Sequence, residues 1–137
     1  MNLQTIGGHI IDVDLLTGGI AIDVGCLGFD FSVGVRKLGC EVHAFDLIEM
    51  DVPRNDIYFS VAAITDKDKV VNVVNTPNRS FWHINQKGKI QVNSISLNKL
   101  YKFFTYERPD CVDVLKLSCE GSEYAILADP DFQPVAK

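Results

Sequence analysis

The chain has 137 residues, and its 47% hydrophobic and 23% charged content is typical of a soluble globular domain rather than a disordered or fibrous chain. At this length, folding buries roughly two-thirds of the surface of the unfolded chain, which is enough for one hydrophobic core. The formal net charge of -5 argues against nucleic acid as the main partner, because phosphate binding requires clustered positive charge. We therefore expect one domain over residues 1–137.

The amino-terminal segment and the cysteines bear on cellular location. Residues 1–16 have no basic cluster and carry Asp12 and Asp14 within their apolar part, a pattern that excludes a conventional signal peptide. No apolar run approaches the length of a membrane span. The four cysteines and three histidines lack the spacing of zinc ligands. We expect reduced thiols, no metal site, no membrane partner and a cytoplasmic protein.

Three elements follow one another after the amino-terminal segment. Ile20–Val24 is apolar and β-branched and is bounded by glycines, which predicts a buried strand. Asp30–Leu38 places apolar side chains on one helical face, and Gly39 follows as a stop signal. Glu41–Phe45 predicts a second buried strand that ends at Asp46. A strand, a helix and a strand in this order form a right-handed βαβ unit with parallel strands.

Further elements continue the alternation. The sequence predicts a third strand at Ile57–Ala63, two shorter strands at Val70–Val74 and Lys89–Val92, and a fourth buried strand at Val112–Leu117. It predicts an amphipathic helix from Leu97 to Phe104 with Ser96 as its N-cap, and a final helix at Glu120–Leu127.

Strands that are apolar on both faces and alternate with helices indicate an α/β fold with a mostly parallel sheet covered on both sides. In such sheets ligands bind beyond the carboxyl ends of the strands. We therefore expect functional residues after Val24, Phe45, the third strand and Leu117.

Two features at these strand ends indicate a nucleoside cofactor. Asp23-Val24-Gly25-Cys26-Leu27-Gly28 forms a glycine turn through which the backbone approaches a ligand closely. Asp46 follows about twenty residues later, where a carboxylate accepts hydrogen bonds from both ribose hydroxyls. These features alone leave a nicotinamide dinucleotide and S-adenosylmethionine open. The absence of the G-x-G-x-x-G pattern, and an acid two residues before Gly25, favour S-adenosylmethionine, whose ammonium group Asp23 could meet.

The segment from Asp113 to Tyr124 reads D-V-L-K-L-S-C-E-G-S-E-Y and resembles the K-x-D-x-E-G-x-E signature of FkbM-type methyltransferases. The turn at Asp23-Val24-Gly25, the strand that ends at Asp46 and the Val61-Ala62-Ala63 segment are similar to other parts of that family. The resemblance runs from about Ile20 to Leu127. It implies a Rossmann-like class I methyltransferase fold, a three-layer sandwich with a mostly parallel sheet.

The resemblance also implies an activity and a site. Family members transfer the methyl group of S-adenosylmethionine, usually to a hydroxyl oxygen, so the expected acceptor is a small molecule or a glycan. The implied cofactor-binding residues are Asp23, Gly25, Cys26, Gly28, Asp46 and Ala62. The implied catalytic residues are Lys116, Ser118 and Glu120.

Two departures from the family pattern leave a second function open. Ser118 stands where the signature has Asp, and a serine cannot replace a carboxylate as a base. The chain also ends at Lys137, so we expect the fold to lack the family's last strands. Either the chain is a fragment or splice form, or a homo-oligomer or a partner chain completes the sheet. The alternative is a non-catalytic binding domain. The aromatic segment Phe81-Trp82-His83 predicts either an acceptor lid or a loop anchored by its own rings.

Overall fold

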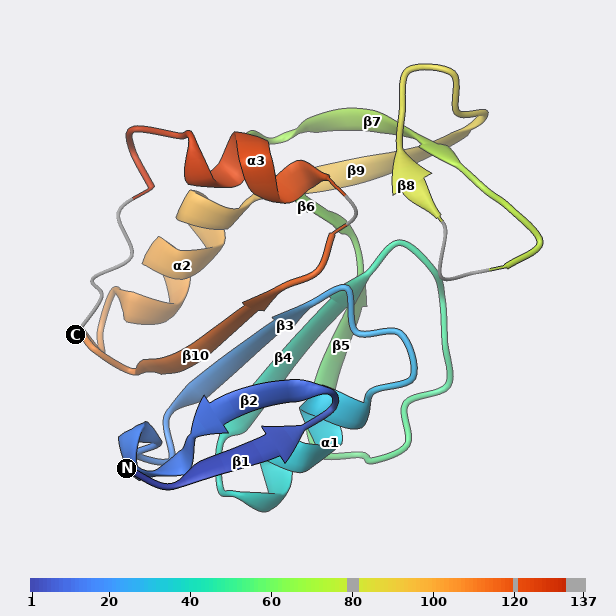
Figure 1. The fold of residues 1–137 in the computed structure, drawn as a ribbon. Helices are drawn as coiled ribbons and strands as arrows, with labels where there is room; N and C mark the ends of the chain where they lie inside the picture. Colours follow the sequence, from blue (N-terminus) through green and yellow to red (C-terminus); the bar gives the residue numbers. More distant parts are fainter. Residues whose placement is uncertain (79–81, 120, 133–137) are drawn as a thin grey trace.

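The computed structural model describes residues 1–78, 82–119 and 121–132, and Figure 1 traces their path. Its centre is a sheet of four parallel strands in the order β10-β3-β4-β5. These strands are β3 (Ile20–Val24), β4 (Glu41–Asp46), β5 (Ile57–Val61) and β10 (Val112–Leu117). The fold class is therefore α/β with a parallel sheet, and the predicted strands β3, β4 and β10 are confirmed.

Helices cover both faces of this sheet (Figure 1). They are α1 (Asp30–Lys37), α2 (Leu97–Thr105) and α3 (Ser122–Leu127). The predicted N-cap of α2 is confirmed, because the Ser96 hydroxyl oxygen accepts a hydrogen bond of 3.3 Å from the N–H of Lys99. None of the described helices combines the length and the apolar character needed to cross a membrane.

Side-chain alternation along the strands divides the hydrophobic interior into two cores. One core lies between α1 and the sheet and includes Phe31, Val35, Val42 and Ala44. The other lies on the opposite face beneath α2 and α3 and includes Ile20, Ile22, Leu97 and Ile126. Burial of each Val, Leu, Ile or Phe side chain in these cores stabilises the fold by roughly 1.5–3 kcal/mol.

The predicted third strand is wrong in one respect, because the structure divides it between two sheets. After β5, the N–H of Ala62 donates a hydrogen bond of 2.9 Å to the carbonyl of Asp46, and the chain turns. It then enters β6 (Ala63–Thr65), which belongs to a second, mixed sheet in the order β6-β9-β7-β8. The run from Ile57 to Thr65 is apolar or β-branched except for Ser60, and it contains no local signal for this change of sheet.

The second sheet also contains β7 (Lys69–Val74), β8 (His83–Ile84) and β9 (Ile90–Ser96). The predicted short strands thus exist, and β7 pairs antiparallel with both β8 and β9. The end predicted for β9 is wrong, since the strand continues to Ser96 and passes directly into α2. Its later part is held by pairing with β6, a contact that the local sequence does not reveal.

A β-hairpin at the amino terminus was not expected. β1 (Leu3–Ile6) and β2 (His9–Asp12) pair antiparallel and precede a short 3-10 turn, η1 (Val13–Leu15). Gly7 and Gly8 connect the strands, both with positive φ, as the favoured two-residue hairpin turn requires. The Gly-Gly pair between two β-branched segments was the available signal.

Candidate functional site

One cavity of about 290 Å³ opens at the carboxyl ends of the parallel strands. Residues at or just beyond the ends of β3, β4, β5 and β10 contribute to its lining: Gly25, Cys26, Asp46, Leu47, Ala62, Ser118 and Cys119. The cavity therefore lies where strand order predicts a ligand site. The volume lies near the lower end of the range of roughly 300–1,000 Å³ that is usual for small-molecule sites.

A buried ion pair joins the neighbouring strands β10 and β3 at one end of this cavity. The Lys116 ammonium nitrogen lies 2.7 Å from Oδ1 of Asp23, and the two side chains are 11% and 0% exposed. The same nitrogen donates to the carbonyl of Gly25 at 2.7 Å. The other carboxylate oxygen of Asp23 accepts a hydrogen bond of 2.6 Å from the Ser32 hydroxyl.

This pair changes the roles expected for its two members. We expected Asp23 to meet the ammonium group of a ligand, whereas the structure places the ammonium of Lys116 against it. An ammonium has three N–H donors, and the described residues accept only two of those of Lys116. Lys116 therefore acts on the site by holding the glycine turn, and one N–H remains for a ligand.

Close contact between β3 and β10 explains the first glycine of the turn. Gly25 has a φ of 77°, a value that residues with a side chain rarely adopt. A Cβ at this position would also overlap the backbone carbonyl of Ser118. Gly28 also has positive φ, at 81°, but a Cβ on it would meet nothing within 4 Å, and Gly28 does not line the cavity. Gly25 is thus required by packing, and Gly28 by backbone conformation.

Asp46 lies at the opposite side of the glycine turn and lacks an ion-pair partner among the described residues. Its Oδ1 accepts a hydrogen bond of 2.7 Å from the N–H of Leu47. Burial raises the pKa of Asp46, and backbone N–H groups of Leu47, Ile48 and Leu27 oppose this effect only in part. A partly buried carboxylate without an ion-pair partner gains most from a ligand that donates hydrogen bonds to it.

Cys26 lines the cavity between these two carboxylates but has no nucleophilic character. Its side chain is 2% exposed. Burial, followed by the nearby charges of Asp23 and Asp46, raises the pKa of the thiol. Cys26 therefore stays protonated and contributes shape rather than reactivity.

Glu123, the last acidic residue of the segment that resembles the family signature, has a structural role. The Glu123 carboxylate accepts hydrogen bonds from the N–H groups of Cys119 and Gly121, each 2.6 Å long. These bonds hold the turn that carries Ser118 and Cys119 into the cavity. Glu120, expected as a catalytic residue, lies outside the described residues.

Sequence reasoning missed several lining residues. His9 and Gly7 come from the tip of the hairpin, and the His9 ring packs edge-on against Phe31 with centroids 5.5 Å apart. Asp30, the first residue of α1, is exposed and has no charged or hydrogen-bonding partner among the described residues. The Gly-Gly turn could have indicated the hairpin, but nothing local places its tip beside α1.

Trp82 confirms one of the two expectations for its aromatic segment, the loop anchored by its own ring, and the acceptor lid stays a prediction. Its indole N–H donates a hydrogen bond of 3.0 Å to the carbonyl of Thr76, so the ring anchors its own loop. The same side chain also lines the cavity. Phe81 lies outside the described residues.

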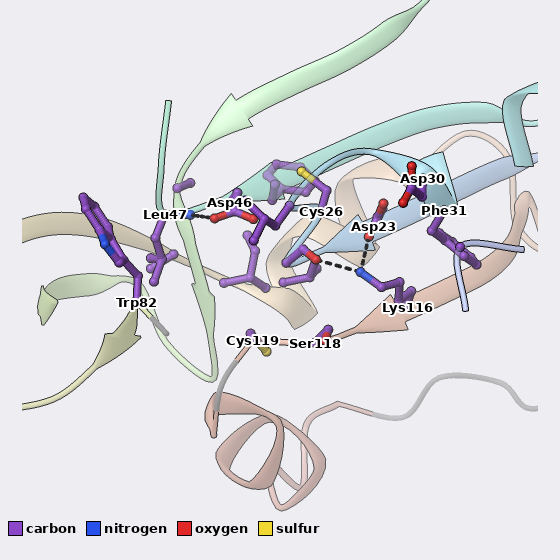
Figure 2. Close-up of a pocket in the computed structure, with 18 of the residues that line it drawn as sticks. Asp23, Cys26, Asp30, Phe31, Asp46, Leu47, Trp82, Lys116, Ser118 and Cys119 are labelled. Atoms are coloured by element: carbon purple, nitrogen blue, oxygen red, sulfur yellow. Dashed lines mark hydrogen bonds and ion pairs between the residues drawn. The ribbon is translucent and has the colours of Figure 1, made fainter. Parts of the chain in front are cut away.

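Figure 2 shows the order of these side chains along the cavity. Trp82 and Leu47 lie at one side, Asp46 and Cys26 follow, and the Asp23–Lys116 pair with Asp30 lies at the other side. The described residues contain no cluster of three or more His, Cys, Asp or Glu side chains arranged to hold a metal ion.

The sequence-predicted residues thus divide into three groups. The cavity brings together Asp23, Gly25, Cys26, Asp46, Ala62, Lys116 and Ser118. Gly28 supports the turn without lining the cavity, and Glu120 is not described. No protein-family model, curated protein or solved structure matches this chain.

Proposed function

We propose that this chain binds S-adenosylmethionine in a Rossmann-like class I methyltransferase fold and transfers its methyl group to a hydroxyl of a small molecule or glycan. The observation that carries the proposal is the order of groups along the cavity. An aromatic and apolar side suits an adenine base, Asp46 suits a ribose, and the charged side suits an amino-acid group. The order matches the three parts of this cofactor.

The charge of the cavity favours S-adenosylmethionine over a nicotinamide dinucleotide. Among the described lining residues, three carboxylates (Asp23, Asp30 and Asp46) surround one ammonium, that of Lys116. Dinucleotide folds place a pyrophosphate at the amino terminus of the first helix. Here Asp30 already puts a negative charge at that position of α1. The site therefore repels a pyrophosphate and attracts sulfonium and ammonium groups.

Each part of the lining has a role in this proposal. Asp46 accepts hydrogen bonds from the two ribose hydroxyls, while Ala62 and Trp82 border the adenine. At the charged end, the remaining N–H of Lys116 binds the ligand carboxylate, and the free carboxylate of Asp30 binds its ammonium group. Asp23 acts through Lys116, whose position it fixes.

The bound cofactor supplies an electrophilic methyl group on its sulfonium sulfur. The protein needs chiefly to align an acceptor hydroxyl with that group and to remove one proton. His9 is the imidazole among the described lining residues and is exposed, so it can accept the proton and release it to water. The Ser118 hydroxyl orients the acceptor by a hydrogen bond.

One observation favours a second function. Ser118 stands at the cavity where the family signature has a carboxylate, and a hydroxyl is not a proton acceptor at neutral pH. If His9 does not replace that carboxylate, the chain binds the cofactor without transferring its methyl group. Such a chain would be a cofactor-binding interaction domain.

Calorimetric titration with S-adenosylhomocysteine, with reduced nicotinamide dinucleotide as the comparison ligand, tests the proposal. We expect saturable binding of the first ligand and none of the second. The Asp46→Asn variant controls for binding outside the cavity. A folded chain that binds only the dinucleotide, or neither ligand, contradicts the proposed function.

A further inference from the structure

Most edges of the two four-stranded sheets are protected against pairing with another chain. In the mixed sheet the edge strands β6 and β8 contain only three and two residues, and in the parallel sheet β10 carries Asp113 and Lys116. Short length and charged side chains are devices that keep an edge strand from pairing. The opposite edge of the parallel sheet is β5 (Figure 1), which has five residues. No charged residue occurs between Ile57 and Thr65, so this edge lacks both devices.

The backbone groups that β5 leaves free belong to Phe59 and Val61. The N–H of Ala62 donates a hydrogen bond of 2.9 Å to β4, so even-numbered residues of this segment direct their backbone groups toward β4. Odd-numbered residues direct theirs away from the sheet, to a side on which no described strand pairs. Ile57 already uses its N–H in a turn, where it donates a hydrogen bond of 3.3 Å to the carbonyl of Arg54. An added strand would therefore pair with Phe59 and Val61.

The side chains of β5 are accessible on both faces of the sheet. Alternation places Tyr58 and Ser60 on the face toward α2, and Phe59 and Val61 on the face toward α1. Tyr58 is 60% exposed and Val61 is 47% exposed, and Ser60 is exposed as well. Stacking on His43, with ring centroids 4.9 Å apart, holds the Tyr58 ring in place. The exposure of Ser60 and Val61 shows that neither helix layer closes off the end of this strand.

A second copy of the same strand is complementary to this edge. When two antiparallel copies are related by a two-fold axis that passes between their Ser60 residues, Phe59 of each copy lies opposite Val61 of the other. These are the residues with free backbone groups, so each such pair exchanges two hydrogen bonds. The side chains then meet as aromatic with β-branched on one face and hydroxyl with hydroxyl on the other, and both combinations stabilise cross-strand pairs. Because the segment is uncharged, the symmetry places no like charges opposite each other.

We propose that this chain forms a two-fold symmetric dimer in which the β5 strands pair antiparallel across Ser60 and join the two parallel sheets into one. The contact consists chiefly of two short strands, so it belongs to the small, transient class of interfaces, and we expect a micromolar dissociation constant. Ala62, which follows β5 directly, lines the cavity, so each cavity lies beside the interface. The dimer does not rest on the proposed function.

Sedimentation velocity of the full chain, from about 5 to about 300 µM, tests for the dimer. We expect the mean mass to rise with concentration from 15.2 kDa toward twice that value. Ser60→Lys places two ammonium groups opposite each other at the axis and should weaken the dimer at least about tenfold. Gln91→Lys also adds a lysine at an exposed strand position, on β9 in the interior of the mixed sheet, and should leave the dimer unchanged. The melting temperatures of both variants, measured at low concentration, should match that of the unmodified chain.

Disulfide cross-linking tests the register. Facing residues of a non-hydrogen-bonded pair have Cα atoms about 4.5 Å apart, within disulfide range, so Ser60→Cys should give a cross-linked dimer on mild oxidation. Tyr58→Cys is the matched control, because this exposed position lies opposite Ala62 of the other copy and should not cross-link. The inference is overturned if the mass stays at 15.2 kDa up to about 300 µM, if both lysine variants weaken the dimer alike, or if both cysteine variants cross-link alike. Because these assays contain no S-adenosylhomocysteine, failure of the dimer and failure of cofactor binding are observed separately.

Discussion

Asp23 and Asp46 are carboxylates of the same cavity, and the protein satisfies them in opposite ways. Asp23 is fully buried and has both oxygens occupied, by Lys116 and by Ser32. Asp46 has only backbone N–H partners among the described residues, and burial raises its pKa. A carboxylate that the protein has already neutralised stabilises the fold, whereas one left without a cation is available to a ligand. The two strand-end acids, equivalent in the sequence, are therefore expected to differ in function.

The largest effect should come from Asp23→Ala. The substitution leaves the Lys116 ammonium, which is 11% exposed, without its counter-charge. We expect the free energy of unfolding to fall by about 3–5 kcal/mol, measured by urea denaturation. The double variant Asp23→Ala with Lys116→Met removes the charge as well and should recover at least half of the loss. An unchanged midpoint for Asp23→Ala would show that the pair does not stabilise the fold.

Unlike Asp23→Ala, Asp46→Asn should change ligand affinity strongly and stability only slightly. The amide keeps the shape of the side chain, so the free energy of unfolding should change by less than about 1 kcal/mol. Affinity for S-adenosylhomocysteine should fall about 100-fold, because hydrogen bonds to a charged acceptor contribute roughly 1.5–3 kcal/mol each. Calorimetric titration measures the loss. Retained affinity would remove Asp46 from the site.

Substitution of Gly25 and Gly28 tests whether close packing against the backbone after β10 fixes the glycine turn at the end of the cavity that contains Lys116. Gly25→Ala would press its Cβ into the Ser118 carbonyl, and we expect a loss of stability of about 3 kcal/mol. Gly28→Ala has a similar φ but open space around the new methyl group, so only the backbone strain of about 1–2 kcal/mol should appear. Equal losses in the two variants would contradict a packing role for Gly25.

The smallest effect should be a pH dependence that distinguishes the two carboxylates. Ribose hydroxyls bind the ionised form of Asp46, so affinity for S-adenosylhomocysteine should decrease as the pH falls through the raised pKa of this group. For folding of the free protein, the pH dependence that Asp46 contributes has the opposite sign. A carboxyl with a raised pKa in the folded state favours folding below its unfolded pKa, and this contribution disappears as the pH rises through the folded value.

The titrations should be repeated with Asp46→Asn as the control. In this variant we expect the residual affinity for S-adenosylhomocysteine to be constant over the same pH range, without the decrease at low pH. A loss of affinity at low pH that persists in the variant would assign the titration to a group other than Asp46.

Much of the parallel sheet could be predicted from the sequence. An apolar run bounded by glycines predicted β3, apolar side chains on one helical face predicted α1, and the segment that ends at Asp46 predicted β4. The carboxyl ends of these strands located the cavity. These features are local, because strand burial and turn conformation depend on neighbouring residues. The glycine turn and Asp46 were accessible for the same reason.

Tertiary structure decided the features that depend on distant contacts. Lys116 and Asp23 are 93 residues apart in the chain, and only the pairing of β10 with β3 brings them together. In the same way, contact with α1 brings His9 to the cavity, and pairing with β9 draws β6 into the second sheet. The sequence by itself determined where β3, β4 and β10 end and which acids lie at the ends of β3 and β4. Only the fold decided which of those acids is neutralised, because that depends on the cation that an adjacent strand supplies.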